Sequence, residues 1–277
     1  GKENTKLQTV SFGDLPICSS YYINDGKQIV CTGYRKYFYT FDLTTGEIEK
    51  TKEIRGCDPD NNGYEKSIGN DEYIIVLVKD TAVLLDTKTK HWIANLKTNA
   101  TIRSASFSSD GSMVSTCGMD GEVYVWDLKE RRCIHRFRDE GAVHSTAIGY
   151  SKGNKYCAIG SGSGIVNLYN AEDTFTKEAP VPIKAISNLT TETSLINFNH
   201  DNQILGIASS QLEKQFRLVH LPSNTVFPNL PTPKDGILNV ADFDFSPNSG
   251  FLAVGNTNGR VLLYRLNHYS KAQRKKL

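Results

Sequence analysis

One pattern recurs six times along this chain: a short apolar run ends in an aromatic or branched residue followed by a polar one. The six closing pairs are Phe41-Asp42, Leu85-Asp86, Trp126-Asp127, Tyr169-Asn170, Val219-His220 and Tyr264-Arg265. They lie 41 to 50 residues apart, and the longest interval, in the fifth unit, indicates a small insertion. A period of this length is typical of proteins that pack copies of one supersecondary unit against each other.

Turn residues divide each unit into short strands. Asp, Asn and Gly, which tolerate positive φ or bond their own backbone, cluster at 108–111, 160–164 and 255–259. Runs rich in Val, Ile, Tyr and Leu lie between such clusters, for example 122–126 and 261–264. Tight turns between runs of this kind predict β-hairpins. No stretch of 12 residues has a convincing helical period, so the sequence predicts an all-β chain of four-stranded units.

A four-stranded sheet cannot bury both of its faces alone, and radial packing against neighbouring sheets solves this. The predicted fold is therefore a WD40-type β-propeller, since a β-sandwich would not repeat at this period. Units are expected to begin near residues 18, 64, 102, 142, 193 and 240. The sixth unit lacks a fourth strand, because the sequence after Leu266 is short and polar. A further strand, Leu7 to Phe12, is expected either to complete the sixth blade or to belong to a preceding one.

The closing pairs should end the third strand of each unit. We expect Trp126 to be buried between blades and Asp127 to bond the local turn. The Gly-His pair that usually opens a WD40 repeat is absent, and a true Trp-Asp closes only one unit. The His-Ser-Trp hydrogen-bond network of standard repeats should therefore be mostly missing.

Charge and composition exclude several classes of protein. The net charge is only +2, so nucleic-acid binding would have to rest on local patches. No run of about 18 apolar residues and no signal peptide is visible, so no membrane contact is expected. Six cysteines, none in a C-x-x-C pair, mostly lie in apolar runs and predict reduced, buried thiols rather than a zinc site.

No catalytic, cofactor-binding or metal-binding constellation is recognisable. The glycine-rich stretch 160–164 has no following Gly-Lys-Ser/Thr, so it is interpreted as a hairpin turn. His144 begins a predicted inner strand, where a structural role is expected. A propeller enzyme would need acidic or His residues converging at the inner strands, and no such charged cluster is apparent. The sequence therefore predicts a protein that is not an enzyme and needs no cofactor.

Two basic clusters remain as candidate contacts for RNA or an acidic partner. One includes Arg131 and Arg132 in a predicted outer hairpin. The other is the C-terminal tail, residues 271–277, with Lys271, Arg274, Lys275 and Lys276. Such runs are often only solvated surface, and any RNA contact would be driven by charge and shape, because no base-stacking motif is visible.

Nearly the whole chain resembles a particular family, most strongly from Thr101 to Tyr269. The residues that carry the resemblance are Asp120 to Asp127 (DGEVYVWD), Arg136 to Gly141 (RFRDEG), Gly164 to Asn170 (GIVNLYN), Pro182 to Ile186 (PIKAI), Arg217 to Ser223 (RLVHLPS), Phe243 to Gly250 (FDFSPNSG) and Leu263 to Tyr269 (LYRLNHY). Together they resemble the WD40 domain of the U-three-snoRNA-associated protein eighteen family, whose members are UtpB subunits of the small-subunit processome.

The resemblance implies seven blades in the full protein, of which about six are covered here. Residues 1–270 would form the propeller, with the first blade incomplete, and 271–277 the basic tail. It implies a nucleolar scaffold in pre-ribosomal RNA processing and small ribosomal subunit assembly. The implied partners are other WD40 subunits of UtpB and, mainly through the assembly, pre-ribosomal RNA and the U-three snoRNA particle. The alternative function is a WD40 adaptor of another nuclear or cytosolic complex.

Overall fold

The computed structural model describes residues 9–54, 63–230 and 236–267. The chain divides into two compact units, Gly1–Asn95 and Leu96–Leu277, and the boundary falls inside one strand. Almost all regular structure is β, arranged as antiparallel sheets of strands that are consecutive in the chain. We call each of these sheets a blade and number the blades in chain order. The predicted all-β class is confirmed.

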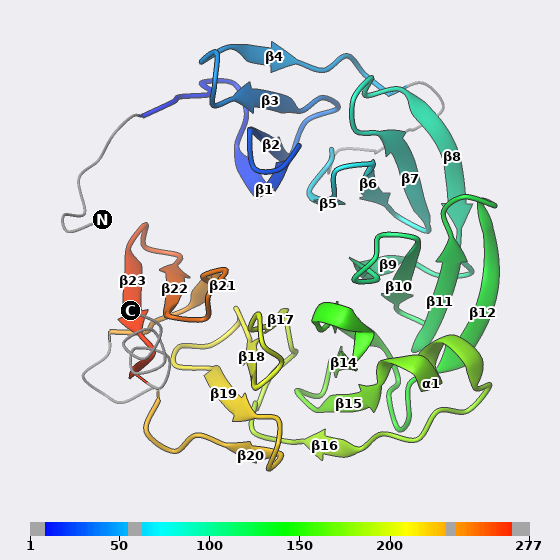
Figure 1. Ribbon diagram of the computed structural model, residues 1–277, viewed down its shortest axis with the longest axis vertical. Coiled ribbons are helices and arrows are strands. Elements are labelled where there is room, and N and C mark those ends of the chain that lie inside the picture. Colours follow the sequence, from blue (N-terminus) through cyan, green and yellow to red (C-terminus); the bar gives the residue numbers. More distant parts are fainter. Residues whose placement is uncertain (1–8, 55–62, 231–235, 268–277) are drawn as a thin grey trace, which may run out of the picture. The chain divides into compact units, whose positions relative to one another are not determined.

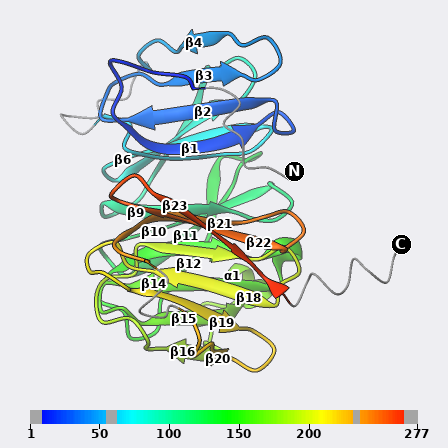
Figure 2. The same ribbon diagram turned by 90° about the vertical axis from the view of Figure 1, so that its left-hand side faces the viewer.

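The first unit holds two four-stranded blades. They are β1 (Ile17–Ile23), β2 (Gln28–Gly33), β3 (Tyr39–Asp42) and β4 (Ile48–Lys50), then β5 (Lys66–Gly69), β6 (Tyr73–Val78), β7 (Thr81–Asp86) and β8 (Trp92–Lys97). Figure 2 shows β1, β2, β3 and β4 side by side in chain order. The two blades share one core, which includes Phe38 from the first blade, Ile74 and Leu85 from the second, and Tyr64 from the linker between them.

The second unit holds three further four-stranded blades and one of three strands. They are β9 (Ile102–Phe107), β10 (Met113–Gly118), β11 (Glu122–Asp127) and β12 (Arg132–Arg138); β13 (Ser145–Tyr150), β14 (Tyr156–Ser161), β15 (Val166–Asn170) and β16 (Lys184–Ile186); β17 (Leu195–Phe198), β18 (Ile204–Ala208), β19 (Phe216–His220) and β20 (Thr225–Val226); and β21 (Val240–Phe245), β22 (Phe251–Asn256) and β23 (Val261–Arg265). They follow one another from green to red in Figure 1, and the first strands of neighbouring blades contact each other.

The described residues hold very little helix. A 3₁₀ turn spans Lys152–Asn154, and α1 (Ala171–Thr176) follows β15, with the Asn170 side chain accepting from the Glu172 amide. None of the helices in the described ranges is long and apolar enough to cross a bilayer.

All six closing pairs end the third strand of their blade, as predicted. Their polar residues are Asp42, Asp86, Asp127, Asn170, His220 and Arg265, the last residues of β3, β7, β11, β15, β19 and β23. In the first three blades the carboxylate caps the turn that follows. Asp42 Oδ1 accepts from the Thr44 amide at 2.8 Å, Asp86 Oδ1 from Thr89 at 2.7 Å, and Asp127 Oδ1 from Glu130 at 2.7 Å. The repeat is therefore a repeat of capped hairpins.

Hydrogen bonds between the first turns of neighbouring blades join the blades of the second unit. The amide of Ser109 donates to Asn154 Oδ1 at 2.7 Å, and the Asn202 side chain donates to the Lys152 carbonyl at 2.8 Å. The His200 amide donates to Ser249 Oγ at 3.1 Å. Asn154, Asn202 and Ser249 have positive φ of 53°, 60° and 54°. The turn residues found in the sequence thus connect the blades as well as reversing the chain.

Two expectations need correction. Residues 9–12 form no strand, and Phe12 instead stacks on Tyr39 at a centroid distance of 5.1 Å, so the strand expected over Leu7 to Phe12 is wrong in its described part. The thiols are also less uniformly buried than expected. Cys31, Cys117 and Cys157 are buried, whereas Cys18 and Cys133 are exposed; Cys57 lies outside the described residues.

Trp126 is buried as expected, with 6% of its surface exposed. Its indole Nε1 donates to Thr116 Oγ1 at 3.0 Å, and the ring stacks on Tyr124 at 6.1 Å. The third blade therefore keeps one contact of the standard repeat network, between Trp126 and the second strand.

The two tryptophans of the chain provide a direct test of burial. Trp126→Ala should lower the free energy of unfolding by about 3–5 kcal/mol, because it removes a large buried side chain and its hydrogen bond. Trp92→Ala should change it by less than about 0.5 kcal/mol, because that indole is 51% exposed. Urea denaturation followed by circular dichroism measures both. Equal effects of the two substitutions would contradict the assigned register of β11.

Candidate functional site

The predicted basic hairpin is the turn between β11 and β12. Arg131 has a φ of 58°, a left-handed conformation that costs a side chain about 1 kcal/mol or more. In the equivalent turn of the first blade, between β3 and β4, Gly46 has a φ of 77°. Glycine adopts this left-handed conformation without the steric cost that a side chain adds. Both Arg131 and Arg132 are exposed. The turn therefore presents Arg131 to solvent at an energetic cost.

Neighbouring groups bind three other arginines of this blade. Arg132 Nε lies 2.5 Å from Glu130 Oε2, and Arg136 Nη1 lies 3.4 Å from Glu122 Oε2. Arg138 Nη2 donates to the Asp120 carbonyl at 3.5 Å. Within the described ranges, no carboxylate lies at ion-pair distance from Arg131. The predicted cluster thus contains fewer uncompensated charges than its sequence suggests, and exposed charges of this kind act weakly and in a salt-dependent way.

The structure describes only one of the two predicted basic clusters. Arg131 and Arg132 lie in the turn just described, whereas Lys271, Arg274, Lys275 and Lys276 lie outside the described residues. The sequence predicted no site around a cavity. Described residues of each unit nevertheless line a cavity.

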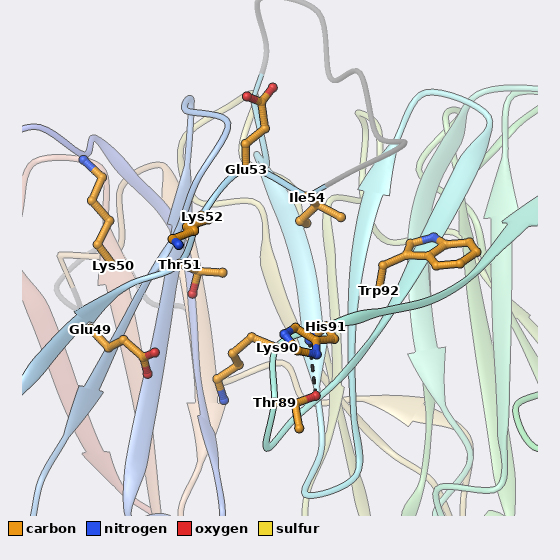
Figure 3. A pocket seen from close by; sticks show the side chains of 10 residues that line it. All are labelled: Glu49, Lys50, Thr51, Lys52, Glu53, Ile54, Thr89, Lys90, His91 and Trp92. Atoms are coloured by element: carbon orange, nitrogen blue, oxygen red, sulfur yellow. Dashed lines mark hydrogen bonds between the residues drawn. The ribbon is translucent and has the colours of Figure 1, made fainter.

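The cavity of the first unit has a volume of about 600 Å³. It is lined by residues 49–54, which end β4 and follow it, and by residues 89–92, which lead into β8 (Figure 3). Lys50 Nζ lies 3.0 Å from Asp14 Oδ2, and burial lowers the pKa of Lys90. The Trp92 ring points away from the other lining side chains in Figure 3. Since Glu49 and Glu53 flank Lys50 and Lys52, the cavity has no strong preference for an anion.

The cavity of the second unit has a volume of about 560 Å³ and is mostly apolar. Residues 138–143, which link β12 to β13, form one wall, and residues 179–181, which precede β16, form the other. Val143 and Val181 are 78% and 72% exposed. Exposed apolar side chains beside a cavity are typical of interaction sites.

A buried carboxylate lies among the residues that line this second cavity. Asp139 Oδ1 accepts from Asn167 Nδ2 at 2.9 Å and from the Tyr169 hydroxyl at 2.7 Å. Asp139 Oδ2 is buried and has no hydrogen-bond partner. Burial raises the pKa of the Asp139 carboxyl, and these two donors offset only part of that effect. Sequence reasoning missed this site, because its donors lie 28 and 30 residues further along the chain.

Some of the first strands of the blades carry charged side chains. β21 includes Asp242 and Asp244, and Asn197 Nδ2 of β17 donates to Asp244 Oδ1 at 2.8 Å. Arg103 of β9 pairs with Glu192 at 2.9 Å. The charged side chains of these strands thus lie on β21 and β9. In the described part of the chain, no three His, Cys, Asp or Glu side chains gather closely enough to hold a metal ion.

One stretch and one histidine that could be taken for catalytic groups have structural roles. The stretch 160–164 forms the end of β14 and the hairpin to β15, as predicted. His144 packs over this hairpin, since a Cβ added at Gly162 would lie 1.7 Å from His144 Nε2.

These features define the class of protein. A family model described as "WD domain, G-beta repeat" matches residues 89–127, which run from the turn before β8 to the last residue of β11. With its six blades of consecutive antiparallel strands, the chain is a WD40-type β-propeller protein.

Comparison with known proteins narrows the class. The chain is 39% identical over 98% of its length to U3 small nucleolar RNA-associated protein 18 homolog of Arabidopsis thaliana, and 38% identical over 98% to the Homo sapiens homolog. It is 32% identical over 97% of its length to U3 small nucleolar RNA-associated protein 18 of Saccharomyces cerevisiae. The chain spans about half the length of these curated relatives, namely 50%, 49% and 53%. The resemblance found in the sequence is confirmed.

The buried carboxylate gives a pH-dependent prediction. Because burial raises the folded-state pKa of Asp139, the folded chain binds this proton more tightly than the unfolded chain. The corresponding stability is present at low pH and is lost as pH rises through the folded-state pKa. Relative to wild type, Asp139→Asn should therefore become more stable between pH 4 and pH 7. Urea denaturation at several pH values measures the difference.

Asp139→Ala is the control. It leaves the Asn167 and Tyr169 donors without their acceptor and should cost roughly 1–3 kcal/mol at neutral pH. A constant difference between wild type and Asp139→Asn from pH 4 to pH 7 would contradict the assignment.

Proposed function

We propose that this chain is a non-enzymatic scaffold domain of a UtpB subunit of the small-subunit processome. In this role it acts in nucleolar pre-ribosomal RNA processing and small ribosomal subunit assembly. The observation that carries the proposal is the alignment over 98% of the chain with proteins named for association with U3 small nucleolar RNA. Relatives from a plant, an animal and a yeast share this name.

The geometry supports a binding role. Exposed apolar residues such as Trp92, Val143 and Val181 offer surface for partners. The proposed partners are other WD40 subunits of the UtpB complex, with pre-ribosomal RNA and the U3 particle reached mainly through the assembly. A WD40 adaptor of another nuclear or cytosolic complex is the second candidate, because the fold alone serves both.

Purification from cells separates these two functions. The full-length protein carrying this chain is tagged in its native host, recovered at moderate salt, and probed for U3 small nucleolar RNA and for co-purifying WD40 subunits. We expect both to be enriched at least tenfold over a tagged unrelated WD40 protein, and depletion of the protein to leave pre-ribosomal RNA unprocessed. A stable complex without U3 RNA, together with normal processing, would contradict the proposal and favour the adaptor.

Direct RNA contact is proposed for Arg131, Arg132, Lys271, Arg274, Lys275 and Lys276. Replacing the four tail residues by Ala should reduce the slope of log affinity against log salt by about 2.8, because each phosphate contact on a single strand contributes about 0.7. Arg131→Gln should reduce it by about 0.7, and Arg132→Gln by less, since Glu130 already compensates Arg132.

A salt titration with a fluorescent single-stranded RNA measures these slopes. Lys27→Gln, at an exposed lysine in the turn between β1 and β2, is the control for loss of one surface charge. Slopes unchanged from wild type would show that the chain acts through protein contacts alone.

A further inference from the structure

The apolar cavity between residues 138–143 and 179–181 has the features of a docking pocket. Val143 and Val181 remain largely exposed although they line a cavity of about 560 Å³. Ala142, Ala179 and Pro180 add further apolar surface. Pockets that bind small ligands usually have volumes of roughly 300–1,000 Å³. The described residues of this chain leave these apolar groups uncovered, so a partner would remove them from water.

The walls of the pocket are held in place before any partner binds. The Glu140 amide donates to the Tyr169 hydroxyl at 3.0 Å, and Asn167 Nδ2 donates to the Glu140 carbonyl at 2.8 Å. The backbone at Ala142 packs closely on the turn before β11. A Cβ added at Gly121 in that turn would lie only 2.9 Å from the Ala142 carbonyl oxygen. A prearranged site loses little entropy on binding.

The charged residues that line the pocket favour a positively charged group. Asp139 and Glu140 line it, and Asp139 Oδ2 lacks a hydrogen-bond partner. Arg138 also lines the pocket, and its guanidinium Nη2 donates to the Asp120 carbonyl at 3.5 Å. Two carboxylates beside an apolar wall fit an aliphatic stem with a cationic end. They repel phosphate, and the lining residues offer no aromatic ring on which a base could stack.

We propose that this pocket binds a lysine or arginine side chain from an extended segment of a protein partner. The aliphatic stem lies against Val143, Pro180 and Val181. The cationic end lies at Glu140, within the field of the buried carboxylate of Asp139. The inference rests on the proposed function only in taking the partner to be a protein, and it holds whichever complex the chain joins.

Short labelled peptides test this directly on the folded chain. Four probes share the sequence Gly-Ala-Val-X-Val-Ala-Gly, with X as Arg, Lys, citrulline or Glu, and binding is followed by fluorescence anisotropy. The Arg and Lys peptides should bind at least fivefold more tightly than the citrulline peptide, which has the shape of arginine without its charge. The Glu peptide should bind most weakly.

Matched variants locate the binding. Val181→Ser and Glu140→Gln should each weaken the Arg peptide at least fivefold. Val261→Ser alters a valine of equal exposure, 71%, on β23, and Glu213→Gln removes an exposed carboxylate elsewhere in the same unit. Both control variants should bind like wild type. Unchanged thermal melting shows that each variant is folded.

Equal binding of the Arg and citrulline peptides would overturn the charge assignment. Loss of binding in the control variants to the same extent, or no binding of any peptide at about 1 mM, would overturn the site. These outcomes are independent of co-purification with U3 RNA, so the pocket and the proposed processome role can fail separately.

Discussion

The structure depends on mutual burial of the faces of neighbouring blades. A four-stranded sheet has two faces, and the residues of one blade are buried by side chains of the next. Phe137 of the third blade meets Tyr169 of the fourth at a ring distance of 6.2 Å, and Phe216 of the fifth meets Phe243 of the sixth at 5.1 Å. Each core within a unit draws on two blades. No blade therefore has a complete core of its own, which explains why the unit must repeat.

This constraint leaves the surface free to vary. The turns need only side chains that bond the turn amides, or residues that adopt a positive φ. The fourth strand of each blade needs to bury only one face. The turn after β11 can therefore hold Arg131 where another blade holds Gly46, and the linker to β13 can present Val143. Interaction surfaces can then change without disturbing the cores between the blades. This property suits a scaffold in a large assembly.

The sequence predicted the elements that depend on local chemistry. The end of every third strand, the turn cap by Asp127 and the burial of Trp126 follow from residue type and spacing, and all are confirmed. Features that depend on strand register were not predictable. Arg136 is compensated because β11 and β12 pair it with Tyr124 and bring it near Glu122. The buried Asp139 was missed for the same reason, because its partners come from another blade.

The most direct test of the central claim is the reactivity of the thiols in the folded chain. Cys117 and Cys157 belong to the core shared by the third and fourth blades, whereas Cys18 and Cys133 are exposed. Brief treatment with iodoacetamide, followed by mass spectrometry, measures each site separately. Shared burial predicts rapid labelling of Cys18 and Cys133, and labelling of Cys117 and Cys157 only after denaturation. Labelling of Cys117 and Cys157 as fast as Cys133 in the folded chain would contradict the packing of blade against blade.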